Sequence, residues 1–133
     1  MKSSALGALI LAILSATRVC AEEIVVIVNP AAALISREQL ADLYLAKGGP
    51  LIPIDQAAGS AIYAEFYRKA TGRDTAQVKA IWSRILFTGR GVPPKQMPNS
   101  AAVKKAVAGD PMAVGYIEKS AVDASVKVAL PLD

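Results

Sequence analysis

An unbroken run of five β-branched residues, Ile24–Val28, constrains the fold of this chain more than any other feature. Side chains on a strand alternate between the two faces of a sheet. A strand that is apolar at every position is therefore covered on both faces. This run predicts a layered fold in which the strand is buried on each side.

Strand and helix patterns alternate along the rest of the chain. Strands are predicted at residues 51–54, 113–117 and 126–130. Helices are predicted to begin after Ser36, which forms a capping box with Gln39, after Ser60, at Asp74 or Thr75, and at Asn99 or Ser100. The alternation indicates an α/β layer structure. The Gly- and Pro-rich segment 89–100 is predicted to be a long loop.

The third predicted helix has the clearest apolar face in the chain. Its apolar residues recur at helical spacing, and they are Val78, Ile81, Trp82, Ile85 and Leu86. Such a stripe normally packs against a core. We therefore expect this face, with Trp82 at its centre, to be buried.

The first 21 residues have the pattern of a secretory signal peptide. Lys2 precedes an apolar run at residues 5–16, and Val19-Cys20-Ala21 ends in small residues. The run is shorter than the about 20 residues that span a bilayer. We expect cleavage after Ala21, which leaves residues 22–133 as one periplasmic domain. Lipid attachment at Cys20 is the alternative.

Composition restricts the chemistry of residues 22–133. The chain has no His, and its one cysteine is Cys20. The usual general base, thiol nucleophile and zinc ligands are therefore missing. We expect no enzyme, no cofactor and no metal. Loss of Lys2 and Arg18 lowers the formal charge from +4 to +2, and no basic block remains. We therefore expect neither nucleic acid nor a membrane surface as a partner.

The turn at Gly59-Ser60 is the main candidate for function. It joins the strand at 51–54 to the next helix. Small residues let a ligand approach the backbone, and the free N–H groups and dipole of a helix N-terminus favour an anion. The alternative is that Ser60 only caps the helix. Asp55 ends the strand, where it either faces a ligand or bonds to turn amides.

Several segments resemble the phosphate ABC transporter periplasmic substrate-binding protein family. They are residues 36–47, the Gly59-Ser60 turn with Phe66 after it, and Val114-Gly115-Tyr116-Ile117. Residues 87–91 and Pro93-Pro94 resemble the short, single-lobe relatives in particular. The resemblance covers residues 29–128. It implies a single three-layer-like α/β lobe of a type II periplasmic binding protein, with a mixed sheet flanked by about four helices.

The resemblance also implies a site and partners. It implies non-catalytic binding of phosphate or a similar small oxyanion by Gly59, Ser60 and Ala61, assisted by Gln56 and Arg90. Family members carry an Arg four residues before the turn's Ser, a position that is Gln56 in this sequence. Arg90 is therefore the expected source of positive charge.

The implied partners are a membrane permease or another envelope protein, and a homodimer is left open. The alternative function is an envelope accessory or protein-interaction role without a small ligand.

Overall fold

The computed structural model describes residues 23–132. The predicted signal peptide and its cleavage site lie outside these residues. Within the described residues, no helix combines the length and the apolar character needed to cross a bilayer.

Five strands form one mixed sheet. They are β1 (Ile24–Val28), β2 (Ile52–Gln56), β3 (Lys95–Met97), β4 (Ala113–Glu118) and β5 (Lys127–Leu132), in the order β3-β2-β4-β1-β5. Strand β2 is parallel to β3 and β4, whereas β1 is antiparallel to β4 and β5. All five residues of β1 are buried, as its sequence predicts.

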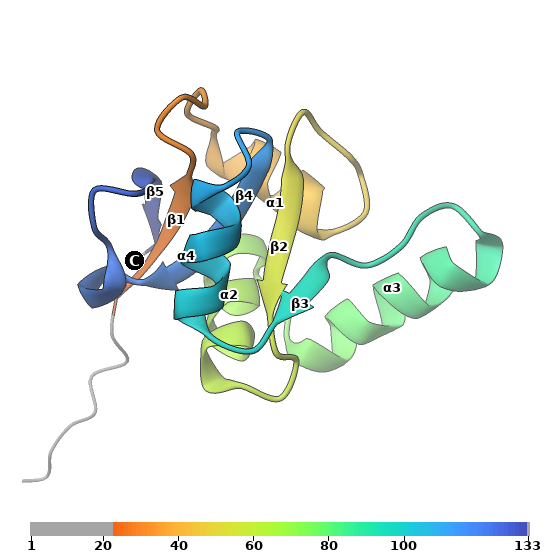
Figure 1. Ribbon diagram of the computed structural model, residues 1–133. Helices are drawn as coiled ribbons and strands as arrows, with labels where there is room; N and C mark the ends of the chain where they lie inside the picture. Colours follow the sequence, from red (N-terminus) through yellow and green to blue (C-terminus); the bar gives the residue numbers. More distant parts are fainter. Residues whose placement is uncertain (1–22, 133) are drawn as a thin grey trace, which may run out of the picture.

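The sheet is covered by helices on both faces (Figure 1). Helices α1 (Arg37–Tyr44) and α2 (Ala61–Thr71) pack on one face, and α4 (Ser100–Ala108) packs on the other. Each face of the sheet has its own apolar cluster, so the predicted three-layer α/β lobe is confirmed. The predicted caps Ser36, Ser60, Asp74 and Asn99 are confirmed as well.

A glycine in β4 sets the distance between the sheet and α4. A Cβ atom at Gly115 would lie 2.5 Å from Cγ1 of Val103 and 3.2 Å from Cγ2 of Val107. Real Cβ atoms essentially never approach another atom within 3.0 Å, so any residue larger than glycine would have to displace Val103. The position of α4 therefore depends on the absence of a side chain here.

Two expectations from the sequence are wrong at the edge of the sheet. Segment 89–100 is not loop throughout, because β3 pairs with β2 within it. Strand β2 also runs beyond residue 54 and includes Asp55 and Gln56. The sequence of β3 is Lys-Gln-Met, which lacks the β-branched residues that mark a strand. Its pairing depends on the neighbouring strand.

Helix α3 (Thr75–Thr88) also differs from its expected burial. Val78 is its one buried residue, Trp82 is half-buried, and Leu86 is 52% exposed. Figure 1 shows why, because α3 extends from the edge of the sheet away from the three layers. Helical spacing identifies an apolar face, but it does not show what lies opposite that face.

Substitutions in the buried core and on the exposed end of α3 should change the free energy of unfolding by different amounts. Phe66 has no exposed surface and stacks on Tyr116 with ring centroids 3.7 Å apart. Phe66→Ala should therefore lower the free energy of unfolding by about 3–5 kcal/mol. Leu86→Ala should change it by no more than about 0.5 kcal/mol, as surface substitutions do. Urea unfolding measures both variants, and equal losses would contradict the described position of α3.

Candidate functional site

A buried carboxylate marks the carboxyl end of β2. Asp55 is 2% exposed, and its Oδ2 accepts a 2.5 Å hydrogen bond from the Tyr67 hydroxyl. Its Oδ1 accepts from the Tyr116 hydroxyl and from the Gln56 N–H. Burial raises the pKa of Asp55 from 3.8 to about 6, although these three hydrogen bonds act to lower the pKa.

The tyrosines around Asp55 remain donors at all ordinary pH values. Burial raises the pKa of Tyr67 and Tyr116, and the nearby negative charge of Asp55 raises both further. Tyr67 comes from α2 and Tyr116 from β4. Asp55 therefore joins a helix of one layer to the middle of the sheet, through two hydroxyl groups that cannot ionise.

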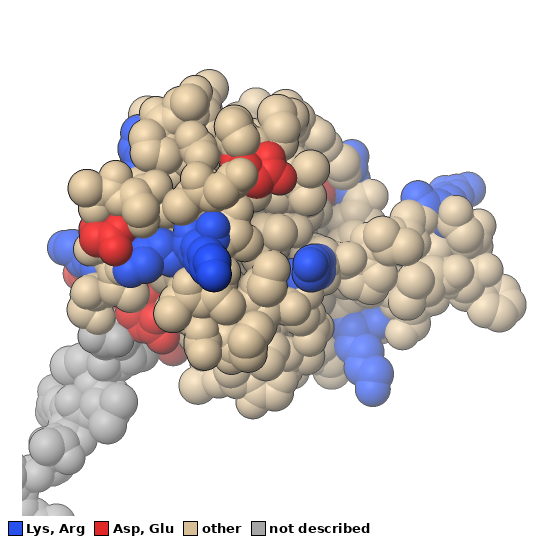
Figure 2. Space-filling view, viewed as in Figure 1, with Lys and Arg blue, Asp and Glu red and all other residues tan. Residues whose placement is uncertain are grey.

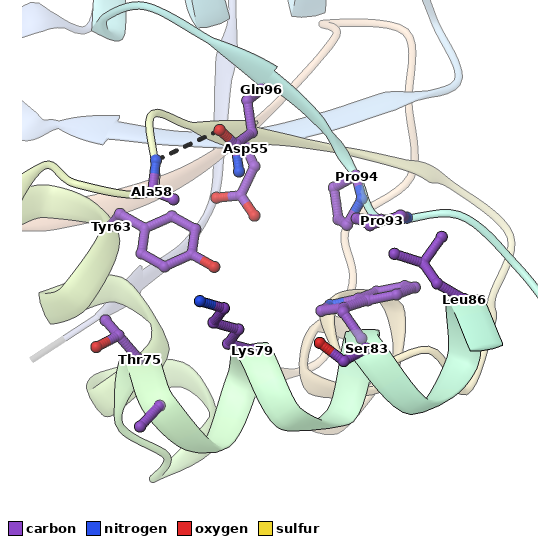
Figure 3. A pocket seen from close by; sticks show the side chains of 12 residues that line it. Asp55, Ala58, Tyr63, Thr75, Lys79, Ser83, Leu86, Pro93, Pro94 and Gln96 are labelled. Atoms are coloured by element: carbon purple, nitrogen blue, oxygen red, sulfur yellow. Dashed lines mark hydrogen bonds between the residues drawn. The ribbon is translucent and has the colours of Figure 1, made fainter.

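A cavity of about 510 Å³ lies between α3 and the ends of β2 and β3. Figure 3 shows Asp55 and Lys79 pointing into it from opposite sides. Lys79 is the one basic residue of its lining and Asp55 the one acidic residue. The remaining wall is formed by Ala58, Tyr63, Thr75, Ala76, Trp82, Ser83, Leu86, Pro93, Pro94 and Gln96.

The Gly59-Ser60 turn lies at the border of this cavity, since Ala58 and Tyr63 on either side of it line the wall. Ser60 is the N-cap of α2: its Oγ accepts from the Tyr63 N–H at 3.3 Å and donates to the Ala57 carbonyl at 2.7 Å. The capping interpretation of Ser60 is therefore confirmed.

Three backbone donors of the turn remain available. The N–H groups of Gly59, Ala61 and Ile62 have no hydrogen-bond acceptor among residues 23–132. The Ala58 N–H, by contrast, donates to Gln96 Oε1 at 3.4 Å (Figure 3). Gly59 and Ala61 are exposed. A small anion at this helix terminus would meet backbone donors and the positive end of the helix dipole.

Gln56 and Arg90, the two assisting residues expected from the sequence, lie elsewhere. Gln56 is buried, and its Nε2 donates to Ser100 Oγ at 2.8 Å and to the Tyr116 carbonyl at 3.0 Å. Arg90 lines a second hollow of about 240 Å³, which includes Pro53 and Val92 and lies beside α3. None of the five predicted residues lines the cavity itself. Gly59, Ser60 and Ala61 lie at its border, between Ala58 and Tyr63 of the wall, whereas Gln56 and Arg90 have the separate surroundings just described.

Comparison with solved structures identifies the fold. The chain matches a phosphate ABC transporter substrate-binding protein with bound phosphate from Clostridium perfringens (TM-score 0.64, 21% identity, 81% of this chain and 44% of that chain). It also matches an ABC-type phosphate transport receptor from Vibrio cholerae (TM-score 0.60, 20% identity, 80% and 45%). PstS from Borrelia burgdorferi is similar at a TM-score of 0.53 (15% identity, 74% and 41%).

The fold is that of one lobe of a phosphate-transport binding protein. The chain spans less than half the length of each of these structures, and the resemblance inferred from the sequence is confirmed at the level of fold. No protein-family model and no curated protein matches the sequence. Two of the three similar proteins are, by name, a substrate-binding protein and a transport receptor.

Sequence reasoning missed Lys79. It stands one residue after the buried Val78, on a helix whose position relative to the turn is set by tertiary packing. Spacing alone gives no signal that a cation on α3 faces the end of β2. Sequence reasoning also missed the tyrosines around Asp55, which read as ordinary core residues. Within the described residues, no group of His, Cys, Asp and Glu side chains could hold a metal ion.

The raised pKa of Asp55 predicts an unusual dependence of stability on pH. Between pH 4 and 6 the folded state holds a proton on Asp55 that the unfolded state has released, so the free energy of unfolding falls as pH rises. A rise from 3.8 to about 6 corresponds to about 3 kcal/mol over this window.

Urea unfolding at a series of pH values measures this loss. Asp55→Asn should remove it, while Asp123→Asn should not, because hydrogen bonds from Lys104 and Ser125 hold the pKa of Asp123 well below its usual range. A wild-type slope that Asp55→Asn leaves unchanged would contradict the assignment.

Proposed function

We propose that this protein is a non-catalytic solute-binding lobe that takes phosphate or a similar small oxyanion at the N-terminus of α2. The observation that carries the proposal is the set of exposed N–H donors at Gly59 and Ala61, beside a cavity with Lys79 on its wall. The similar structures support it, because one of them is a phosphate ABC transporter substrate-binding protein with bound phosphate.

Backbone donors account for recognition of the anion in this proposal. Ser60 already donates its hydroxyl proton to the Ala57 carbonyl. Ser60 therefore contributes mainly by holding the turn, and the N–H groups of Gly59, Ala61 and Ile62 contact the ligand. A hydrogen bond to a charged group contributes about 1.5–3 kcal/mol, so three such donors suffice for a weak to moderate site.

Lys79 supplies the positive charge in place of Arg90. Its ammonium group points into the cavity that borders the turn (Figure 3), and it forms no ion pair within residues 23–132. The carboxylate of Asp55 opposes an anion in the same cavity. That opposition is reduced because both Asp55 oxygens already accept hydrogen bonds.

The wider biological setting is part of the proposal. We infer a secreted, periplasmic protein whose signal peptide is cleaved after Ala21, acting with a membrane permease in phosphate transport. Residues 22–133 then form the working domain, and a second copy could complete a cleft. The pattern of residues 1–21 and the fold of residues 23–132 support this setting.

Calorimetric titration with phosphate tests the donor assignment through Ala61→Pro. Ala61 is the first residue of α2, where proline is favoured, and Ser60 before it already has the extended backbone (φ −83°, ψ 153°) that a following proline requires. The variant therefore deletes one N–H without breaking the helix. We expect the dissociation constant to rise about tenfold or more.

Ala61→Gly is the matched control, because it keeps the N–H and should bind phosphate as the parent does. If Ala61→Pro binds phosphate as tightly as Ala61→Gly, the anion does not contact this amide and the proposed site is wrong.

A second pair of variants locates the positive charge. Lys79→Gln should weaken phosphate binding and reduce its dependence on salt, because a cation near the ligand is lost. Arg90→Gln makes the same change of net charge in the second hollow and should leave affinity almost unchanged. The reverse result would restore Arg90 as the cation and remove Lys79 from the site.

One observation favours the second candidate, an envelope accessory or protein-interaction role. Phe87, at the end of α3, is 94% exposed. A phosphate site at α2 gives this side chain no role.

A further inference from the structure

The protein has a projecting arm with an apolar tip. We define the arm as residues 75–95, which comprise α3, the loop after it and the first residue of β3. Its far end carries three exposed apolar side chains: Leu86 is 52% exposed, Phe87 94% and Val92 78%. Figure 1 shows α3 and its following loop as the part of the fold that reaches farthest from the sheet. The tip is therefore convex, and Phe87 and Val92 face water, whereas Leu86 also borders the cavity.

The arm also carries positive charge without any negative charge. No Asp or Glu occurs between Asp74 and Asp110 in the sequence. The arm carries Lys79, Arg84, Arg90 and Lys95, all of them exposed, and none forms an ion pair within residues 23–132. Figure 2 shows Lys and Arg, but no Asp or Glu, on the part of the arm that is in view.

We propose that the arm tip docks on a bilayer surface that contains anionic lipids. Phe87 and Val92 enter the interfacial region, while Arg84 and Arg90 contact lipid phosphates. The exposed apolar groups match the acyl chains of such a surface, and the unpaired cations beside them match its anionic headgroups. The binding is peripheral.

Three other partners fit the arm less well. A second copy would bring two positive arms together, which like charges oppose. A nucleic acid would pair with the arginines but would leave the apolar tip in water. An acidic protein would need a concave apolar socket for this convex tip. A fluid bilayer surface needs no preformed socket.

This inference revises an expectation from the sequence. The whole-chain charge of residues 22–133 is small and no basic block is visible, so a membrane surface was not expected. The fold changes this expectation, because it places the four cations of the arm on a projection that contains no acidic residue. Local charge at the docking surface, rather than net charge, determines attraction to an anionic membrane.

Vesicle co-sedimentation tests the proposal with residues 22–133, the domain expected after cleavage, which carries the whole sheet and both apolar clusters. The protein should bind vesicles of phosphatidylcholine that contain about 30% of the anionic lipid phosphatidylglycerol. It should bind vesicles of phosphatidylcholine alone much more weakly. Binding should also fall as salt is added. Equal binding to both vesicles, or to neither, would overturn the proposal.

Two pairs of variants identify the surface. Phe87→Ser with Val92→Ser should abolish most of the binding, whereas Leu34→Ser, also on an exposed side chain but outside the arm, should not. Arg84→Gln with Arg90→Gln should weaken binding about 30-fold, from about 1 kcal/mol per cation. Lys105→Gln with Lys119→Gln makes the same change of net charge on α4 and after β4, outside the arm, and should have little effect.

Sedimentation velocity without lipid distinguishes self-association. The Phe87→Ser, Val92→Ser variant should have the same sedimentation coefficient as the parent, because the proposed tip contacts lipid and not a second copy. A dimer that this variant dissociates would show that the tip contacts a second copy, and the lipid proposal would be wrong.

Discussion

The contact between Asp55 and two tyrosine hydroxyls is the interaction on which the rest of the structure depends. A carboxylate with 2% exposure is costly to bury unless donors surround it. Tyr67 approaches from α2 and Tyr116 from β4, so satisfying one charge fixes a helix against the sheet. Asp55 is the residue before the last one of β2, so this contact lies where the strand ends. The chain then turns at Gly59-Ser60 with its free amides at the surface.

Aromatic rings packed around Tyr67 and Tyr116 hold these two tyrosines in place. Phe66 stacks on Tyr116 with an interplanar angle of 4°, and Tyr44 packs edge-on against both rings. The Tyr44 hydroxyl also donates to the Ile54 carbonyl at 2.7 Å, next to Asp55 in β2. Helices α1 and α2 are therefore positioned by side chains of the sheet. Trp82 links α3 to this layer by donating to the Tyr44 carbonyl, and beyond Trp82 the helix leaves the body.

The sequence predicted those features that depend on residues close together in the chain. The caps at Ser36, Ser60 and Asp74 are local hydrogen bonds, and the burial of β1 follows from five consecutive apolar side chains. Features that depend on distant parts of the chain were missed. Strand β3 forms because β2 lies beside it, and Lys79 reaches the cavity because the start of α3 lies across the cavity from Asp55 at the end of β2. The apolar stripe of α3 correctly predicted a helix, but the extent of its burial depends on a sheet edge that no local pattern encodes.

The central claim is that the N-terminus of α2 binds a small oxyanion with backbone donors. Amide chemical shifts of isotope-labelled protein during titration with phosphate report most directly on those donors. The account predicts progressive, saturating shifts concentrated at Gly59, Ala61 and Ile62, with smaller shifts near Lys79. Shifts concentrated at Gly89, Arg90 and Gly91, or none at any amide at high millimolar phosphate, would contradict it.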